Sequence, residues 1–114
     1  LIIEDEEYLR DLYSEILNDY IVECVKDGFD ALGKEIKYDL YIVDIGLPGM
    51  DGLKTIEKLK EIYGNHIKTI VVTGYDILEY TKRLKRCNPN MVLHKPFKIL
   101  DLVGAVDTVL NNKG

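Results

Sequence analysis

The sequence predicts an α/β domain of the form (βα)5, in which five parallel strands form one sheet and helices cover both of its faces. Three observations lead to this prediction. Five short apolar runs rich in β-branched residues recur along the 114 residues, and segments with a helical spacing of apolar residues separate them. Each gap between runs is about a dozen residues or longer, which is enough for a helical crossover between parallel strands.

The predicted strands are the apolar runs themselves, and in chain order they are Leu1–Ile3, Ile21–Val25, Leu40–Val43, Ile67–Val72 and Met91–Leu93. Four of these runs do not alternate with polar residues, which is typical of strands that are buried on both faces. The fifth run is too short for its pattern to be informative. We therefore expect a three-layer sandwich with the sheet in the middle.

The segments between the strands each have an apolar stripe at helical spacing. In chain order the stripes are Leu9, Leu12, Tyr13, Ile16 and Leu17; Phe29, Leu32 and Ile36; Leu53, Ile56, Leu59 and Tyr63; Ile77, Thr81 and Leu84; and Ile99, Leu102, Val103, Val106 and Leu110. The fourth stripe is the weakest, because charged residues surround it. This pattern predicts that the fourth helix is the most exposed one.

Composition and charge favour a globular domain and exclude several functions. Apolar residues make up 46% of the chain and charged residues 31%, which is not the composition of a disordered chain. The net charge of −5 argues against direct nucleic-acid binding, which depends on clustered Lys and Arg. Cys24 and Cys87 lie far apart and form no CxxC motif, so we expect reduced thiols.

The chain shows no sign of a membrane or export role. No apolar stretch reaches the ~18 residues that span a bilayer, and no secretion signal begins the sequence. We therefore expect a cytoplasmic protein without a membrane partner, and residues 1–114 are predicted to form a single domain. Because a strand begins at Leu1 without an initiator Met, the N-terminus is predicted to be trimmed by a few residues.

Polar side chains that could bind a ligand or take part in catalysis follow four of the predicted strands. In an open parallel sheet, ligands bind at the carboxyl ends of the strands. At those ends lie Glu4 and Asp5, then Asp44, Thr73 and Lys95. Three neighbouring carboxylates repel one another, so a cation is expected among them, and hard oxygen ligands favour Mg²⁺. With a metal, an ammonium group and a hydroxyl around it, Asp44 would be a nucleophile toward a phosphoryl group.

Each of these residue types also has an ordinary structural interpretation. Acidic residues stabilise helix N-termini, Asp and Thr start turns, and most lysines are solvated surface residues. Taken singly, the residues at the strand ends do not distinguish these interpretations from a functional site. Their joint placement at four different strand ends favours the site.

The motifs at these strand ends resemble those of a known family. In order they are Glu4-Asp5-Glu6, the DxxLPGMDG stretch from Asp44 to Gly52, Val72-Thr73-Gly74 and Lys95-Pro96-Phe97. In this order and spacing they resemble the receiver domain of two-component response regulators, and the resemblance covers essentially the whole chain. It implies the flavodoxin-like fold with the strand order 2-1-3-4-5.

The resemblance also implies a role for each matching residue. Asp44 corresponds to the phospho-accepting aspartate, and Thr73 and Lys95 correspond to the hydroxyl and ammonium groups that contact the phosphoryl group. The implied ligands of the cofactor Mg²⁺ are Glu4, Asp5, Asp44 and the backbone carbonyl of Gly46. In the family the peptide bond before Pro96 is cis.

Three positions depart from the common pattern of the family. Glu4 stands where Asp is more common, and its longer side chain is expected to make the metal contact water-mediated. Gly46 and Tyr75 occupy positions that tune the phosphoryl lifetime in the family, and they act in opposite directions. Val92 replaces the aromatic residue whose rotation reports phosphorylation, so we expect a switch without ring rotation.

The implied function is a signalling switch that catalyses its own aspartyl phosphorylation and slow dephosphorylation rather than a conventional turnover enzyme. The implied partner is a sensor histidine kinase or phosphotransfer protein. On phosphorylation, the surface formed by the fourth helix, fifth strand and fifth helix is expected to change its conformation. The sequence leaves open whether the domain acts on an output domain or a downstream protein, and whether it forms a homodimer.

Two alternative functions remain at this point. One is a receiver-like interaction module that is never phosphorylated, although all the expected site residues are present. The other is a phosphohydrolase of the dehalogenase type, whose DxD motif the sequence lacks because residue 46 is Gly.

Overall fold

The computed structural model describes residues 1–111, without the side chain of Ile77, and shows a five-stranded sheet in which every neighbouring pair of strands is parallel. The strand order β2-β1-β3-β4-β5 confirms the predicted fold. The elements are β1 (Ile2–Ile3), α1 (Glu7–Ile16), β2 (Cys24–Val25), α2 (Gly28–Gly33), β3 (Tyr41–Asp44), α3 (Gly52–Tyr63), β4 (Thr69–Thr73), the 3-10 helix η1 (Ile77–Tyr80), α4 (Thr81–Cys87), β5 (Met91–His94) and α5 (Ile99–Asn111).

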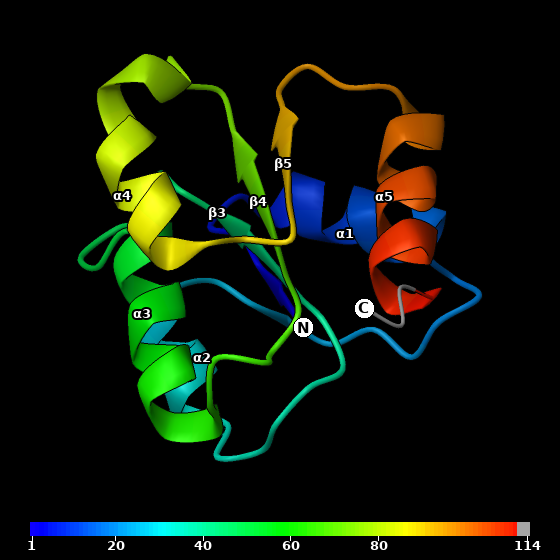
Figure 1. The fold of residues 1–114 in the computed structure, drawn as a ribbon. Coiled ribbons are helices and arrows are strands. Elements are labelled where there is room, and N and C mark those ends of the chain that lie inside the picture. Colours follow the sequence, from blue (N-terminus) through cyan, green and yellow to red (C-terminus); the bar gives the residue numbers. More distant parts are fainter. Residues whose placement is uncertain (112–114) are drawn as a thin grey trace.

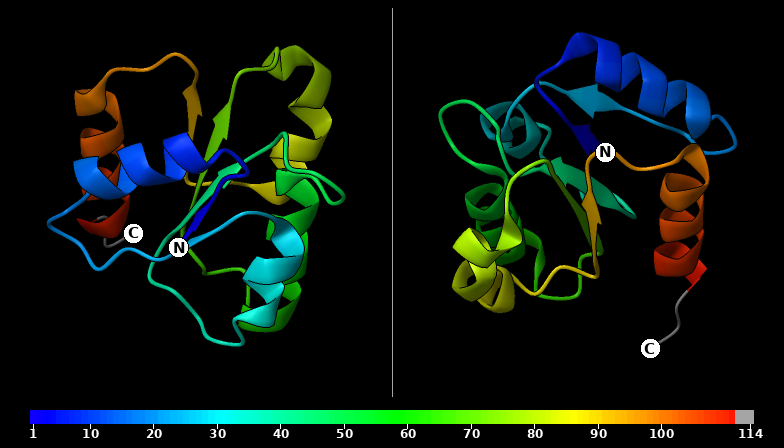
Figure 2. Two further views of the ribbon diagram at one scale, coloured as in Figure 1. Left: turned by 180° about the vertical axis from the view of Figure 1, so that it is seen from behind. Right: turned by 90° about the horizontal axis from the view of Figure 1, so that it is seen from above.

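Helices cover both faces of the sheet, as Figure 1 and Figure 2 show. Successive residues of a strand point to opposite faces, so Ile2 packs on the side of α1 and α5, whereas Ile3 packs on the side of α2, α3 and α4. The same alternation separates Ile42 from Val43 in β3. Two apolar layers therefore enclose the sheet.

The register of the strands aligns their carboxyl ends. Ile3 pairs with Val43, so Glu4 and Asp44 follow at neighbouring positions of β1 and β3. Asp44 pairs with Val72, and Thr73 pairs with His94. The residues that end the strands consequently meet along one edge of the sheet.

Two predicted elements are shorter than their apolar patterns suggest. The second strand does not begin at Ile21, which is fully exposed, because β1 pairs only with Cys24 and Val25. The second helix ends before Ile36, because Glu35 adopts a left-handed backbone with φ 58° that cannot continue an α-helix.

The fourth helical segment is not one regular α-helix. It begins as the 3-10 helix η1 and continues as the seven-residue helix α4, which ends at Asn88 with φ 51°. The predicted stripe residue Ile77 has a side chain that lies outside the described part of the structure. Leu84 packs against the core but is only half-buried.

Two further expectations concern the membrane and the cysteines. None of the described helices is long and apolar enough to cross a bilayer. Cys24 and Cys87 are both free thiols, and Cys87 is buried among core residues.

The Thr69→Val variant should unfold at a higher urea concentration than the parent, with a gain of about 1 kcal/mol in the free energy of unfolding. The Thr69 hydroxyl is fully buried at the start of β4 and has no hydrogen-bond partner in the part of the chain that the structure describes. An isosteric methyl group removes this unsatisfied donor.

The matched control is Thr55→Val, because Thr55 is equally buried but its hydroxyl donates to the Asp51 carbonyl at 2.9 Å. This variant should lose about 1 kcal/mol. A loss of stability in both variants would contradict the interpretation of Thr69.

Candidate functional site

A lysine joins two carboxylates at the carboxyl edge of the sheet. Lys95 follows β5, and its Nζ donates a hydrogen bond to Asp44 Oδ2 at 2.9 Å and another to Glu4 Oε1 at 3.2 Å. Asp44 is the last residue of β3, and Glu4 directly follows β1. The structure therefore brings together three of the residues that the sequence predicts for the site.

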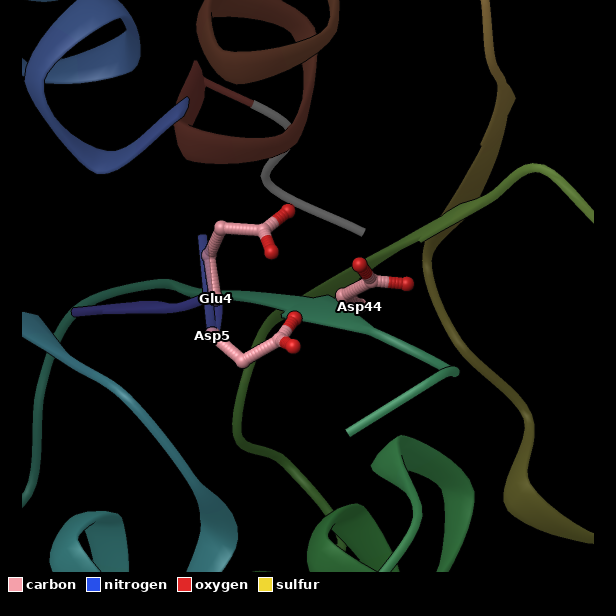
Figure 3. A group of neighbouring side chains, drawn as sticks. All are labelled: Glu4, Asp5 and Asp44. Atoms are coloured by element: carbon pink, nitrogen blue, oxygen red, sulfur yellow. The ribbon is translucent and has the colours of Figure 1, made fainter. Parts of the chain in front are cut away.

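Three carboxylates gather at the same point. Glu4, Asp5 and Asp44 each offer one carboxylate oxygen, and these oxygens lie within 4.8 Å of one another. Figure 3 shows the three side chains converging from the ends of β1 and β3. Glu4 and Asp44 are buried, whereas Asp5 is exposed to solvent. An all-oxygen set of this kind suits a hard divalent cation.

Burial dominates the protonation behaviour of Glu4. Its side chain is 1% exposed, and this burial, with the nearby charge of Asp44, raises the pKa of Glu4 to about 7 despite the hydrogen bond from the Glu6 N–H and the charge of Lys95. Burial lowers the pKa of Lys95, but the hydrogen bond and charge of Asp44 and the charge of Glu4 outweigh it, so the pKa lies above its usual value. The ammonium form of Lys95 is therefore the resident form.

The loop after β3 closes tightly around Asp44. The Gly46 N–H donates to Asp44 Oδ1 at 3.1 Å, and the Gly52 N–H donates to the Ile45 carbonyl at 2.9 Å. A Cβ atom on Gly52 would lie 2.1 Å from the Asp44 carbonyl oxygen, so only glycine fits where α3 begins. The role of the Gly46 carbonyl as a metal ligand stays a prediction.

Thr73 lies at the expected strand end, where it is the last residue of β4. The side chain is fully buried, and Oγ1 accepts a hydrogen bond from the Tyr75 N–H at 2.9 Å. The Tyr75 ring lies over Gly46, where an added Cβ would come within 2.9 Å of it. The peptide bond between Lys95 and Pro96 is cis, as the resemblance implies.

One residue near the acidic cluster is absent from the sequence-based set. Arg10 Nη1 donates to the backbone carbonyls of Glu4 at 2.8 Å and Asp5 at 2.9 Å. The available signal was weak, because a single arginine in an amphipathic helix usually is a solvated surface residue.

Comparison with known proteins decides the family. Residues 1–107 match the family model described as the response regulator receiver domain. The chain belongs to this family. The receiver domain predicted from the four motifs is thereby confirmed, together with its fold.

The receiver domain has relatives of different lengths. It is 32% identical over 114 residues to sporulation initiation phosphotransferase F of Bacillus subtilis, an alignment that covers 96% of this chain and 91% of that protein. It is also 32% identical over 110 residues to the transcriptional regulatory protein HprR of Escherichia coli, covering 93% of this chain. The receiver domain spans 48% of the length of HprR, which is about half.

Solved structures agree with this assignment. A response regulator receiver domain protein (CheY-like) from Methanospirillum hungatei has a crystal structure that matches this receiver domain with a TM-score of 0.89. The two chains are 28% identical, and the match covers 96% of this chain and 90% of the other.

A Glu4→Gln variant should gain stability over the parent as the pH rises, when both are measured without divalent cations. In the parent, the folded state binds the Glu4 proton up to about pH 7, whereas an unfolded glutamate releases it near its usual pKa. As the pH rises, the parent therefore loses stability between these two pKa values, and this contribution stays constant above the higher one.

The difference in free energy of unfolding between the variant and the parent should grow by roughly 3 kcal/mol from about pH 4.5 to about pH 7. Urea unfolding at several pH values measures it. An exposed glutamate, Glu15, gives the control Glu15→Gln. If the advantage of Glu4→Gln shrank with rising pH, the ion pair with Lys95 would outweigh the cost of burial.

Proposed function

We propose that this receiver domain accepts a phosphoryl group on a carboxylate oxygen of Asp44 in a Mg²⁺-dependent reaction. The donor is a phosphohistidine of a sensor histidine kinase or phosphotransfer protein, or a small phosphodonor. The observation that supports the proposal best is the ammonium group of Lys95 at 2.9 Å from Asp44 Oδ2, with two further carboxylates beside it.

The donor set fits a magnesium ion. Asp5, Asp44 and Glu4 would hold it, together with the backbone carbonyl of Gly46 as the proposed further ligand. A bound Mg²⁺ neutralises charge on the phosphoryl oxygens. Because Glu4 already bonds Lys95 and the Glu6 N–H, we expect its contact with the ion to be mediated by water, as its longer side chain suggests.

The transfer step needs few groups from this chain. The P–N bond of the donor phosphohistidine breaks while a P–O bond forms to Asp44, and the released imidazole nitrogen takes up a proton from solvent. Lys95 neutralises charge on the transferred group, and the Thr73 hydroxyl donates a hydrogen bond to it. Slow hydrolysis of the acyl phosphate by water returns the free Asp44 carboxylate and inorganic phosphate.

Phosphorylation would reach the α4, β5 and α5 surface through Thr73. The Thr73 hydroxyl can donate to a phosphoryl oxygen while Oγ1 still accepts from the Tyr75 N–H, so a shift of this side chain toward the phosphoryl group would pull on that hydrogen bond. The backbone between β4 and η1 would follow, because that hydrogen bond closes it. Val92 is half-buried against the core on this face, so the change needs no rotating ring.

The relatives suggest two settings for this switch. The Bacillus relative has nearly the length of this chain, and its name describes a phosphotransferase. The Escherichia relative is about twice as long, and its name describes a transcriptional regulator. We propose that the partner downstream is either a phosphotransfer protein or an output domain that reads the α4, β5 and α5 surface.

Incubation with acetyl phosphate and Mg²⁺ should add about 80 Da to the parent protein and nothing to Asp44→Asn, because the acyl phosphate needs a carboxylate. Intact-mass spectrometry measures the adduct. Asp19→Asn is the matched control, since Asp19 is exposed and far from the site in sequence, and it should be modified like the parent. An unmodified parent at saturating Mg²⁺ would support an interaction module that is never phosphorylated.

Addition of beryllofluoride, a phosphoryl mimic, should change the amide exchange of residues 74–90 measured by mass spectrometry. The reason is that Thr73 donates to the mimic and draws with it the backbone of Tyr75, whose N–H is bonded to the Thr73 hydroxyl oxygen. Asp44→Asn, treated identically, should show no change. Unaltered exchange in this stretch, with the mimic bound, would contradict the proposed output surface.

A further inference from the structure

Arg10 lies in the first turns of α1 and faces the loop that bears the acid pair. It is the only basic residue among residues 1–20, where seven acidic residues surround it: Glu4, Asp5, Glu6, Glu7, Asp11, Glu15 and Asp19. Yet within the described part of the chain Arg10 forms no ion pair with any of them at 4 Å or less; the hydrogen bonds of its guanidinium go to the backbone carbonyls of Glu4 and Asp5.

These two bonds complete the hydrogen bonding of the loop between β1 and α1. The Glu4 N–H donates to the Val25 carbonyl at 3.1 Å, and the Glu6 N–H donates to Glu4 Oε2 at 3.1 Å. The Glu6 carbonyl accepts from the backbone N–H of Arg10 at 3.0 Å. Without the guanidinium, the carbonyls of Glu4 and Asp5 would lose their partner on this chain.

The N-terminus of α1 also lacks the usual side-chain cap. Glu6 occupies the N-cap position, but its side chain makes no capping hydrogen bond, so the entry into the helix is not held in the common way. Arg10 replaces this restraint, because it fastens the loop to the helix from one turn further along. The orientation of the loop decides where the carboxylates of Glu4 and Asp5 point.

We propose that Arg10 is a positioning residue for the metal site: by binding the carbonyls of Glu4 and Asp5, it holds both carboxylates toward Asp44. This inference rests on the proposed function, because the two carboxylates need this orientation only if they bind the ion for phosphoryl transfer. It differs from a ligand role, because the Arg10 guanidinium bonds the backbone carbonyls of the loop and not the carboxylates that would hold the ion.

The sign of the effect separates positioning from charge. A cation beside a cation site weakens metal binding by repulsion, so removing the charge of Arg10 would by electrostatics alone strengthen Mg²⁺ binding. Loss of positioning acts in the opposite direction. Removal of groups that orient metal ligands typically weakens metal binding about 10- to 100-fold.

The test compares Arg10→Met, Arg10→Lys and the matched control Arg86→Met. Met retains the length of the side chain without donors, Lys retains one donor group, and Arg86 is an exposed arginine of α4. A Mg²⁺ titration followed by the NMR shift of the Gly46 amide should show affinity about 10- to 100-fold weaker for Arg10→Met, intermediate for Arg10→Lys, and unchanged for Arg86→Met.

A second measurement needs no metal. Amide exchange at Glu6 should be faster in Arg10→Met than in Arg86→Met, because the loop is released. Unchanged or tighter Mg²⁺ binding in a folded Arg10→Met overturns the inference, even if that variant unfolds more easily. Unchanged exchange at Glu6 overturns it as well. A parent that binds no Mg²⁺ overturns the proposed function itself, and Arg10 then has no metal site to position.

Discussion

The ammonium group of Lys95, bonded to the carboxylates of Asp44 and Glu4, is the interaction on which the arrangement of the site depends. Both acids are buried, and their carboxylate oxygens lie within 4.8 Å of each other. Two buried carboxylates this close repel each other strongly when both are ionised. One cation that bonds both reduces the repulsion. It also ties the end of β5 to β1 and β3 across the intervening strand β4, so the geometry of the site and the alignment of the sheet depend on the same contact.

Two features of the backbone around this contact leave little freedom. The Asp44 carbonyl lies so close to Gly52 that no side chain fits there, and α3 therefore starts directly against the end of β3. On the β1 side, Arg10 fastens the carbonyls that precede α1. Helices on the two faces of the sheet thus hold the loops of the site from opposite sides, which keeps the like charges together.

The sequence predicts the order of elements and the residues at strand ends well, because both follow from local patterns: apolar spacing for the elements and parallel topology for their ends. It does not predict where pairing stops, since the exposure of Ile21 depends on the two residues that β1 offers as partners. Nor does it reveal side-chain partners. The Thr73 hydroxyl accepts from Tyr75, and Arg10 bonds carbonyls rather than acids, and both choices depend on three-dimensional packing.

The contacts of α4 bear on the proposed response of this helix to phosphorylation. Arg83 makes a bidentate pair with Asp51 at 2.8 Å for both bonds, and Lys60 caps the other end through the Cys87 carbonyl at 2.6 Å. Both side chains of the pair are partly exposed. The pair therefore adds about 0–1 kcal/mol to the stability of the fold and mainly sets the orientation of α4. Charge-assisted bonds to a phosphate are stronger than such a restraint. On phosphorylation, a helix of seven residues held in this way would therefore shift before the buried strands do.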